Sequence, residues 1–322
     1  MSIAAFMEKN FLHFNARETL AAAQAWRKLL DDGGKMFLAM GGAMSTAEIG
    51  ISLARMIREG KVHAISTTAA NLEEDIFNLI AHDEYKTTPD YRALSVEDEV
   101  RIRDEGFNRV TDTCIPESSF RKIEQLLLDY WIEAAEKNEP CYQQDHVFRL
   151  LREGKLDDMM QVPRENSWVA AAMDMDIPVF APGFEDSTMG NVFTARVIDG
   201  TVKSHRAVRS GTEQMQKLVE WYVAEEQQRG GVGFFQIAGG IAGDFPICAV
   251  PLIIQDLERK DIKHWSYFAQ ISDSTTSYGS YSGAVPNEKI TWHKLDPAAP
   301  KFMINSDASI VAPLIFSYVL GD

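Results

Sequence analysis

Six short segments of the chain are almost continuously apolar, and most of them end in glycine, serine, threonine or aspartate. They cover residues 36–42, 62–68, 177–183, 232–240, 267–272 and 302–307. A strand with one solvated face alternates apolar and polar residues, whereas a strand covered on both faces is apolar throughout. The pattern therefore predicts six buried strands of a mostly parallel sheet.

Stretches with helical periodicity lie between these segments, at residues 47–59, 118–137, 211–228 and 309–320. The second begins with serine, a frequent helix N-cap, and the third is followed by Gly230 and Gly231, which end it. Strands that alternate with helices predict an α/β fold, a doubly wound, Rossmann-like sheet of six strands. Such sheets bind ligands beyond the carboxyl ends of their strands, where the strand order reverses.

Residues 83–168 interrupt this alternation. They contain long helical patterns and no clear strand. We therefore expect a helical insertion within a single domain that spans residues 1–322.

The composition is typical of a globular protein, with 45% hydrophobic and 25% charged residues among 322. A net charge of −15 would repel a phosphate backbone, so nucleic acid is not expected as a partner. The first ten residues lack the basic start and long apolar core of a signal peptide, and no apolar run reaches the length of a membrane span. We expect a cytoplasmic protein without membrane association.

Cysteine and histidine usage argues against metal sites and disulfides. The three cysteines, Cys114, Cys141 and Cys248, are far apart and form no CxxC pair. The seven histidines are scattered without metal-ligand spacing. We expect reduced, buried thiols and no bound metal.

A glycine-rich turn follows the fourth apolar segment. Gly239 and Gly240, with the next three residues, would let a backbone approach a phosphate at the start of a helix. The spacing matches the dinucleotide fingerprint only in part, and a simple tight turn explains it equally well.

An acidic cluster follows the second apolar segment, in the sequence TTAANLEED at residues 67–75. Three acids in a first helical turn suit the helix dipole, and three exceed what that purpose requires. They could also hold ribose hydroxyls or an ammonium group. From the residues alone, a solvated helix cap is the favoured interpretation.

A third cluster lies at residues 280–295, where a Gly/Ser/Tyr loop leads to Glu288, Trp292, His293 and Lys294. A lysine beside an aromatic ring and near carboxylates can form a Schiff base, although an isolated lysine is usually a surface charge.

Together these segments resemble the deoxyhypusine synthase family, and they occur in that family's order. Residues 37–50 and 62–75 resemble its first two strands, and APGFEDSTMGN at 181–191 resembles its central acidic loop. PNEKITWHKL at 286–295 and INSDASIVAPLIF at 304–316 resemble its C-terminal active-site sequence. The resemblance extends over residues 37–320, and its most specific parts are Trp292-x-Lys294 and Asp307-Ala308-Ser309.

The resemblance implies an NAD-dependent transfer. In that family NAD oxidises a polyamine, a lysine takes the aminobutyl group as a Schiff base, and the group passes to an acceptor amine. By this resemblance Lys294 is the nucleophile, Trp292 lines the amine channel and Glu288 anchors an ammonium group. The implied cofactor positions are Thr67, Thr68, Glu73, Glu74, Asp186, Gly239, Gly240, Asp307 and Ala308. The resemblance also implies a homotetramer with active sites at subunit interfaces.

The amine pocket departs from the family's pattern. Asp244 or Phe245 stands near the place of a catalytic histidine, while Asn191 and Tyr281 replace two aspartates. Tyr278 replaces a further acid. Because a long triamine needs a carboxylate at each cationic end, this pocket is predicted to take a different, less cationic amine.

Three hypotheses follow. The first is an NAD-dependent aminoalkyl transferase for small molecules, for example of the homospermidine synthase type with a diamine acceptor. The second is a true deoxyhypusine synthase that modifies a lysine of a translation factor. The third is an NAD-binding protein that has lost catalysis, which the missing histidine favours and the retained Lys294 opposes.

Overall fold

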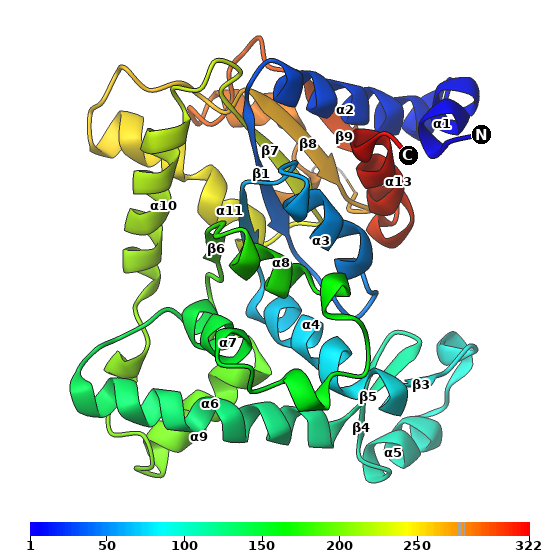
Figure 1. Cartoon of the computed structure of the whole chain (residues 1–322). Helices are drawn as coiled ribbons and strands as arrows, with labels where there is room; N and C mark the ends of the chain where they lie inside the picture. Colours follow the sequence, from blue (N-terminus) through cyan, green and yellow to red (C-terminus); the bar gives the residue numbers. More distant parts are fainter. Residues whose placement is uncertain (276–278, 280) are drawn as a thin grey trace.

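The computed structural model describes residues 1–275, 279 and 281–322, without the side chain of Tyr281. Tyr278, one of the positions where the chain departs from the family pattern, lies outside the described residues. The chain forms a parallel sheet with helices on both faces, and a second group of helices lies at one end of it (Figure 1).

All six predicted strands are present in one sheet, and every neighbouring pair is parallel. The strand order is β6-β2-β1-β7-β8-β9. Their bounds are β1 Lys35–Met40, β2 Ala64–Thr67, β6 Val179–Phe180, β7 Val232–Ile237, β8 Tyr267–Ile271 and β9 Lys301–Ile304. The chain leaves β1 toward one edge of the sheet and later continues from β7 toward the other. The strand order therefore reverses between β1 and β7, as in a doubly wound fold.

Alternate residues of the strands enter two separate hydrophobic cores, which explains their continuous apolar pattern. In β1, Met36, Leu38 and Met40 join one core, and Phe37 and Ala39 join the other. All five side chains are fully buried. The predicted two-sided burial is thereby confirmed.

Different helices cover the two faces. The first core includes residues of α2, α3, α4, α8 and α13, and the second includes residues of α10, α11 and α12. Figure 1 shows α10 on the opposite side of the sheet from α2, α3 and α13. The bounds are α1 Ile3–Asn10, α2 Phe14–Asp31, α3 Gly50–Arg58, α4 Ala69–Ala81, α8 Trp168–Asp174, α10 Gly211–Glu225, α11 Ile241–Ile247, α12 Ala249–Pro251 and α13 Ala308–Leu320.

The insertion contains a second sheet, so the expectation that residues 83–168 lack strands was wrong. Three short antiparallel strands have the order β3-β5-β4. They are β3 Lys86–Thr87, β4 Phe107–Val110 and β5 Thr113–Pro116, and they accompany α5 Val96–Asp104, α6 Glu117–Lys137 and α7 Gln143–Arg152. Helix α9, Thr188–Ile198, packs against α4 and α6.

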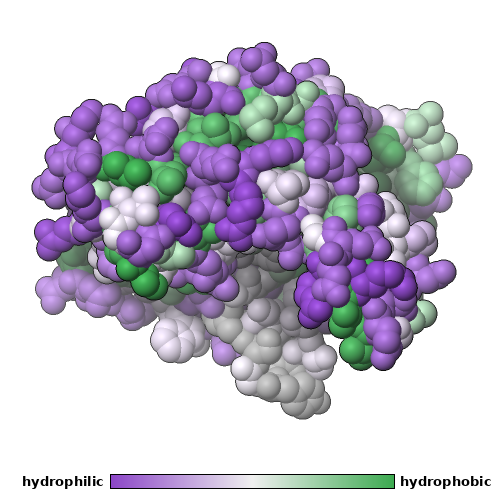
Figure 2. Space-filling view, turned by 90° about the horizontal axis from the view of Figure 1, so that it is seen from below, coloured by the Kyte–Doolittle hydropathy of each residue, from purple (hydrophilic) through white to green (hydrophobic). Residues whose placement is uncertain are grey.

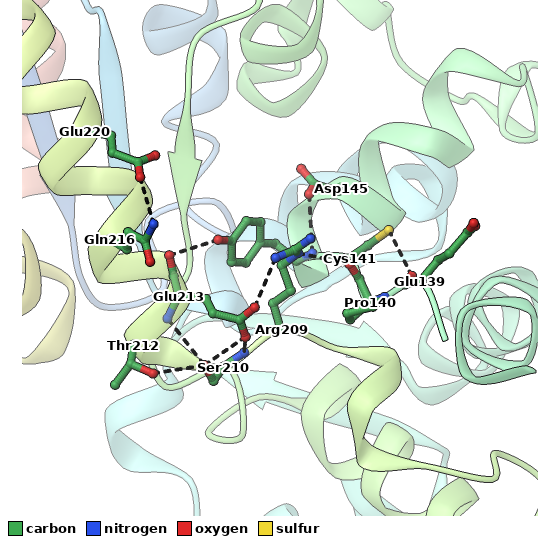
Figure 3. Close-up of polar contacts among 11 residues, drawn as sticks. Glu139, Pro140, Cys141, Asp145, Arg209, Ser210, Thr212, Glu213, Gln216 and Glu220 are labelled. Carbon is green, nitrogen blue, oxygen red and sulfur yellow. Dashed lines mark hydrogen bonds and ion pairs between the residues drawn. The ribbon is translucent and has the colours of Figure 1, made fainter. Parts of the chain in front are cut away.

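The connection between α6 and α7 is fastened to the segment before α10 (Figure 3). Cys141 and Val208 form a parallel bridge, and the Arg209 amide donates to the Cys141 carbonyl at 3.0 Å. The Arg209 guanidinium also donates to the Pro140 carbonyl and to Glu213. These contacts tie the insertion to the helix that covers one face of the main sheet.

The two ends of the chain meet, since the Ala4 amide donates to the Asp322 carbonyl at 2.8 Å. Among the residues that the structure describes, no helix has the length and apolarity needed to cross a bilayer. The face shown in Figure 2 is largely hydrophilic, with separate small hydrophobic areas. The polarity of this face agrees with the net charge of −15.

Candidate functional site

The turns after β1 and β7 lie against each other at the point where the strand order reverses. A Cβ added to Gly41 would lie 2.7 Å from the Gly239 carbonyl oxygen. Gly42 and Gly240 have φ angles of +66° and +73°, and a Cβ at either would meet nothing within 4 Å. Only glycine at position 41 allows its backbone to approach Gly239 this closely. Gly42 and Gly240 border open space.

Side chains from α4 hold the turn after β1. Asn71 is fully buried, accepts the Ser45 amide at 2.9 Å and donates to the carbonyls of Met40 and Gly41, both at 3.3 Å. Thr68 caps α4 and donates to the Gly42 carbonyl. The turn is therefore fixed before any ligand arrives.

Thr67 ends β2 at this same edge. Its hydroxyl oxygen is buried and has no hydrogen-bond partner in the described part of the chain. Buried hydroxyls normally have partners, so a ligand group at this place would satisfy an otherwise costly atom. The unpartnered Thr67 hydroxyl and the open space at Gly42 and Gly240 fit a dinucleotide bound at the carboxyl edge of the sheet.

A second segment covers the turn after β7. The side-chain amide of Gln270 donates through Nε2 to the Ala238 carbonyl at 2.9 Å and to the Ser282 carbonyl at 3.1 Å. Ser282 is pressed against Gly239, where an added Cβ would lie 1.8 Å from the serine hydroxyl oxygen. The loop that carries Ser282 and the glycine turn thus form one unit.

Asp307 and Ala308 also lie at this edge, just beyond the end of β9. Asp307 is the exposed N-cap of α13 and accepts the Ser309 amide at 2.8 Å. Because all six strands are parallel, Asp307 and Gly239 lie at the same edge of the sheet, as predicted.

The acidic cluster on α4 is buried, which corrects the expectation of a solvated first turn. The helix begins at Ala69, so Glu73, Glu74 and Asp75 follow its first turn, and all three are less than 9% exposed. Glu73 accepts the amides of Thr188 and Met189, at 3.0 and 2.8 Å, at the start of α9. Asp75 accepts amides at the start of α8.

Burial is the largest influence on the pKa values of these three acids. It raises the pKa of Glu73, Glu74 and Asp75 to about 7 each, although the hydrogen bonds they accept act in the opposite direction. Glu74 accepts the Thr46 amide at 3.3 Å. These carboxylates hold helices and the β1–α3 loop beneath the carboxyl edge.

A separate cavity of 480 Å³ contains the predicted nucleophile. Its walls include apolar side chains and the three residues that the resemblance assigned to the amine site. The lining residues are Met215, Cys248, Pro251, Leu252, Asp256, Ala284, Glu288, Lys289, Trp292 and Lys294. Lys294, Trp292 and Glu288 are therefore brought together.

Backbone contacts fix Lys294 in this cavity. Its amide donates to the Lys289 carbonyl at 3.1 Å, and its own carbonyl accepts the Trp265 amide just before β8. The side chain is 6% exposed, and its Nζ lies 5.8 Å from the centroid of the Trp292 ring. Trp292 itself is 61% exposed, so the aromatic wall of the cavity faces outward.

Two further polar groups, Cys248 and Asp244, belong to this region. Burial raises the pKa of the Cys248 thiol, and the charge and hydrogen bond of Lys294 oppose that rise. Asp244, on α11, acts electrostatically on both Cys248 and Lys289. Asp244 therefore lies within electrostatic range of Cys248 and Lys289, in the region where the resemblance places the family's histidine.

Lys289 is a site residue that sequence reasoning missed. It is 2% exposed and lines the same cavity as Lys294. Burial, followed by the charge of Lys294, lowers the pKa of Lys289 to about 8. A lysine in a polar stretch resembles a surface residue, and no feature of the sequence distinguishes it.

The remaining predicted residues lie elsewhere. Asn191 is exposed on α9, and its side chain donates to the Ser187 carbonyl at 2.7 Å. Asp186 is exposed in the loop before α9. Tyr281 begins a short 3-10 turn in the Ser282 segment. Among the side chains that the structure describes, those of Asn191 and Asp186 do not line the lysine cavity.

Of the three cysteines, Cys248 lines the lysine cavity. The three cysteines are free, but only Cys114 is fully buried. The described residues contain no cluster of three or more metal-ligating side chains.

A family model described as deoxyhypusine synthase matches residues 4–319. A "Probable deoxyhypusine synthase 2" of Methanosarcina acetivorans is 25% identical over 305 residues, which cover 94% of this chain and 81% of that protein. A "Deoxyhypusine synthase-like protein" of Cyanothece sp. is 27% identical over 306 residues, or 92% of this chain and 73% of the relative.

The fold has a solved counterpart. The crystal structure of a "putative deoxyhypusine synthase" from Entamoeba histolytica is similar with a TM-score of 0.58 and 14% sequence identity. The similarity covers 99% of this chain and 92% of that one. At this identity the likeness concerns the fold alone.

Proposed function

The chain belongs to the deoxyhypusine synthase family, and on that premise we propose that it transfers an aminoalkyl group, with NAD as cofactor, through an imine on Lys294. The acceptor in this proposal is a small-molecule amine such as a diamine. The observation that carries it is the burial of Lys294 in a 480 Å³ cavity that Trp292 and Glu288 also line.

The cofactor is assigned to the carboxyl edge of the sheet. Thr67, Thr68, Gly239, Gly240, Asp307 and Ala308 would hold it there, with Asp186 on the neighbouring loop. When bound, NAD would accept a hydride from the carbon attached to the donor's amine and later return it. Glu73 and Glu74 support this edge by holding the backbone of α9 and of the β1–α3 loop.

Lys294 supplies the covalent step. Its uncharged amine bonds to the oxidised carbon of the donor, and the donor's original amine departs with its electron pair and a proton. The acceptor amine then displaces Lys294 from the same carbon, and the lysine regains a proton. We assign Asp244 to hold the protons or ammonium groups involved, since it acts on the charges around Lys294.

Trp292 and Glu288 form the entrance. The exposed indole presents a π face that attracts cations, and the Glu288 carboxylate lies beside it. An exposed aromatic wall also supports assembly into a homotetramer whose subunits complete one another's sites. Light scattering of the purified protein measures that assembly directly.

Turnover with a panel of amines distinguishes the possible activities. We expect product from NAD and two small amines, identified by mass spectrometry. Transfer from spermidine to a protein lysine as the best reaction would identify a true deoxyhypusine synthase, which family membership alone favours. NAD binding without any transfer would identify a protein that has lost catalysis.

A further inference from the structure

Two glutamines lie side by side near the carboxyl ends of β7 and β8. Gln236 and Gln270 are paired in the register of the sheet, and each is 1% exposed. Neighbouring residues in register point to the same face of a sheet, here the face that carries Phe268 and the second core. Helix α11 covers Gln236 closely, since a Cβ on Gly243 would lie 2.4 Å from its Nε2. Two amide groups are thus buried in an otherwise apolar face.

Both amides hold the same backbone carbonyl, that of Ala238. Gln236 donates to it through Nε2 at 3.1 Å, and Gln270 donates through Nε2 at 2.9 Å. Ala238 has a φ angle of +60°, a left-handed conformation that is unfavourable for a residue with a Cβ. Because Ala238 directly precedes Gly239 and Gly240, the two glutamines fix the start of the glycine turn in this strained conformation.

The orientation of the amides follows from their partner, because a carbonyl oxygen can only accept a hydrogen bond. Each glutamine must therefore turn its nitrogen toward Ala238. The Oε1 atoms of both glutamines are buried and have no hydrogen-bond partner in the described part of the chain. Buried acceptors without partners are destabilising, and an apolar pair would avoid them. We therefore attribute the presence of glutamine at both positions to the carbonyls that the amide nitrogens hold.

Gln270 makes a second contact that its neighbour does not share. Its Nε2 also donates to the Ser282 carbonyl at 3.1 Å. Ser282 begins the stretch 282–294, called here the lysine segment, in which Ala284 and Lys294 both line the lysine cavity. One side-chain nitrogen thus joins the glycine turn to the first residue of the segment that ends in the predicted nucleophile.

We propose that Gln270 is a positioning residue that links the cofactor edge to the lysine cavity. Because one nitrogen holds both Ala238 and Ser282, NAD bound at the glycine turn also steadies the segment that carries Lys294. The proposal rests on the proposed function, since it takes NAD to bind at this turn and Lys294 to form the imine. Gln236, which holds Ala238 without Ser282, supports NAD binding alone.

Hydrogen exchange of the lysine segment, with and without NAD, tests the link. Gln236→Met is the matched control for Gln270→Met, because both remove an amide from Ala238 and only the second releases Ser282. We expect exchange in the segment to be about tenfold faster in Gln270→Met and within about twofold of the wild type in Gln236→Met, as the loss of one buried hydrogen bond allows. NAD should slow this exchange in the wild type and in Gln236→Met, but not in Gln270→Met.

NAD binding and trapping of the imine on Lys294 separate positioning from a general structural role. Both variants should bind NAD about threefold to tenfold more weakly. At saturating NAD, Gln236→Met should form the Lys294 adduct at the wild-type rate, and Gln270→Met about tenfold more slowly. Adding Ala238→Gly removes the backbone strain and should restore NAD affinity in both variants. It should not restore the rate in Gln270→Met, whereas a general structural role predicts that affinity and rate recover together.

Melting temperatures show whether each variant has folded. Gln270→Asn, which is one methylene shorter and cannot reach both carbonyls, serves in place of Gln270→Met if that variant does not fold. The proposal is overturned if Gln270→Met leaves exchange in the lysine segment unchanged, if Gln236→Met accelerates it equally, or if Gln270→Met forms the adduct at the wild-type rate. Exchange without NAD requires no turnover. A wild type that forms no adduct would therefore refute the proposed function, while the exchange comparison still decides whether Gln270 holds the segment.

Discussion

Gly239 and Ser282 are packed so closely that a Cβ on the glycine would lie 1.8 Å from the serine hydroxyl oxygen and 2.5 Å from the serine Cβ. The contact joins the turn after β7 to the segment that leads toward Lys294. Any side chain at Gly239 must displace Ser282 from the edge at which we place NAD.

Gly239→Ala should therefore weaken NAD binding while the protein still folds. NAD at about 100 times its Kd should stabilise the wild type by roughly 2.7 kcal/mol, and the variant should gain much less from the same concentration. Thermal unfolding with and without NAD measures the difference. Gly211→Ala is the control, because its Cβ would meet nothing within 4 Å. The double variant Gly239→Ala/Ser282→Gly should regain part of the stabilisation by NAD. If NAD stabilises Gly239→Ala as much as the wild type, the assignment of NAD to this edge is refuted.

The burial of Glu73 predicts a pH-dependent stability. Its pKa is raised from 4.5 to about 7 in the folded protein, so the folded state binds a proton that the unfolded state releases. The resulting stabilisation is complete below about pH 4.5 and is lost as the pH rises through about 7. The loss for this group alone is roughly 3 kcal/mol at about 1.36 kcal/mol per pKa unit.

Glu73→Gln should accordingly flatten the decline in unfolding free energy between pH 5 and pH 8, although its single amide oxygen can accept only one of the two α9 amides, which lowers stability at every pH. Urea unfolding across this range measures the slope. Glu185→Gln, an exposed change in the loop before α9, controls for the general effect of net charge. Equal slopes in the wild type and Glu73→Gln would show that Glu73 is not responsible.

Asn71→Ala should destabilise the protein by about 2–4 kcal/mol, because the Ser45 amide and the carbonyls of Met40 and Gly41 lose a buried partner. Urea unfolding gives the free energy. Asn108→Ala, at an exposed position on β4, should change it by less than about 0.5 kcal/mol. Similar effects of the two substitutions would contradict the role assigned to Asn71.

The main sheet could be predicted from the sequence because burial on both faces leaves a direct record in each strand. Met36 and Phe37 enter different cores, so neither face of β1 needs a polar residue. The small sheet could not be found in this way. Strand β3 has two residues, both exposed, and β4 has no fully buried residue, so neither shows an apolar period.

The site was predictable only in part. Lys294 and Trp292 were indicated by their neighbours in the sequence and by the resemblance, and the cavity brings them together. Glu73 was misjudged because α4 begins at Ala69, which carries the acids past the first turn and into the interior. Lys289 could not be identified, because its burial depends on Phe268 of β8, which is distant in the sequence.

In the proposed reaction, Lys294 carries the transferred group. Incubation with NAD and candidate amines, followed by cyanoborohydride reduction, would trap an imine on the enzyme. Mass analysis of the peptides should then show the added aminoalkyl mass on Lys294, with none on Lys294→Ala and an unchanged yield on the exposed-site control Lys260→Ala. Lys294→Ala should still bind NAD, because the cofactor is assigned to other residues. An adduct on a different lysine, or product formed by Lys294→Ala at the wild-type rate, would contradict the claim.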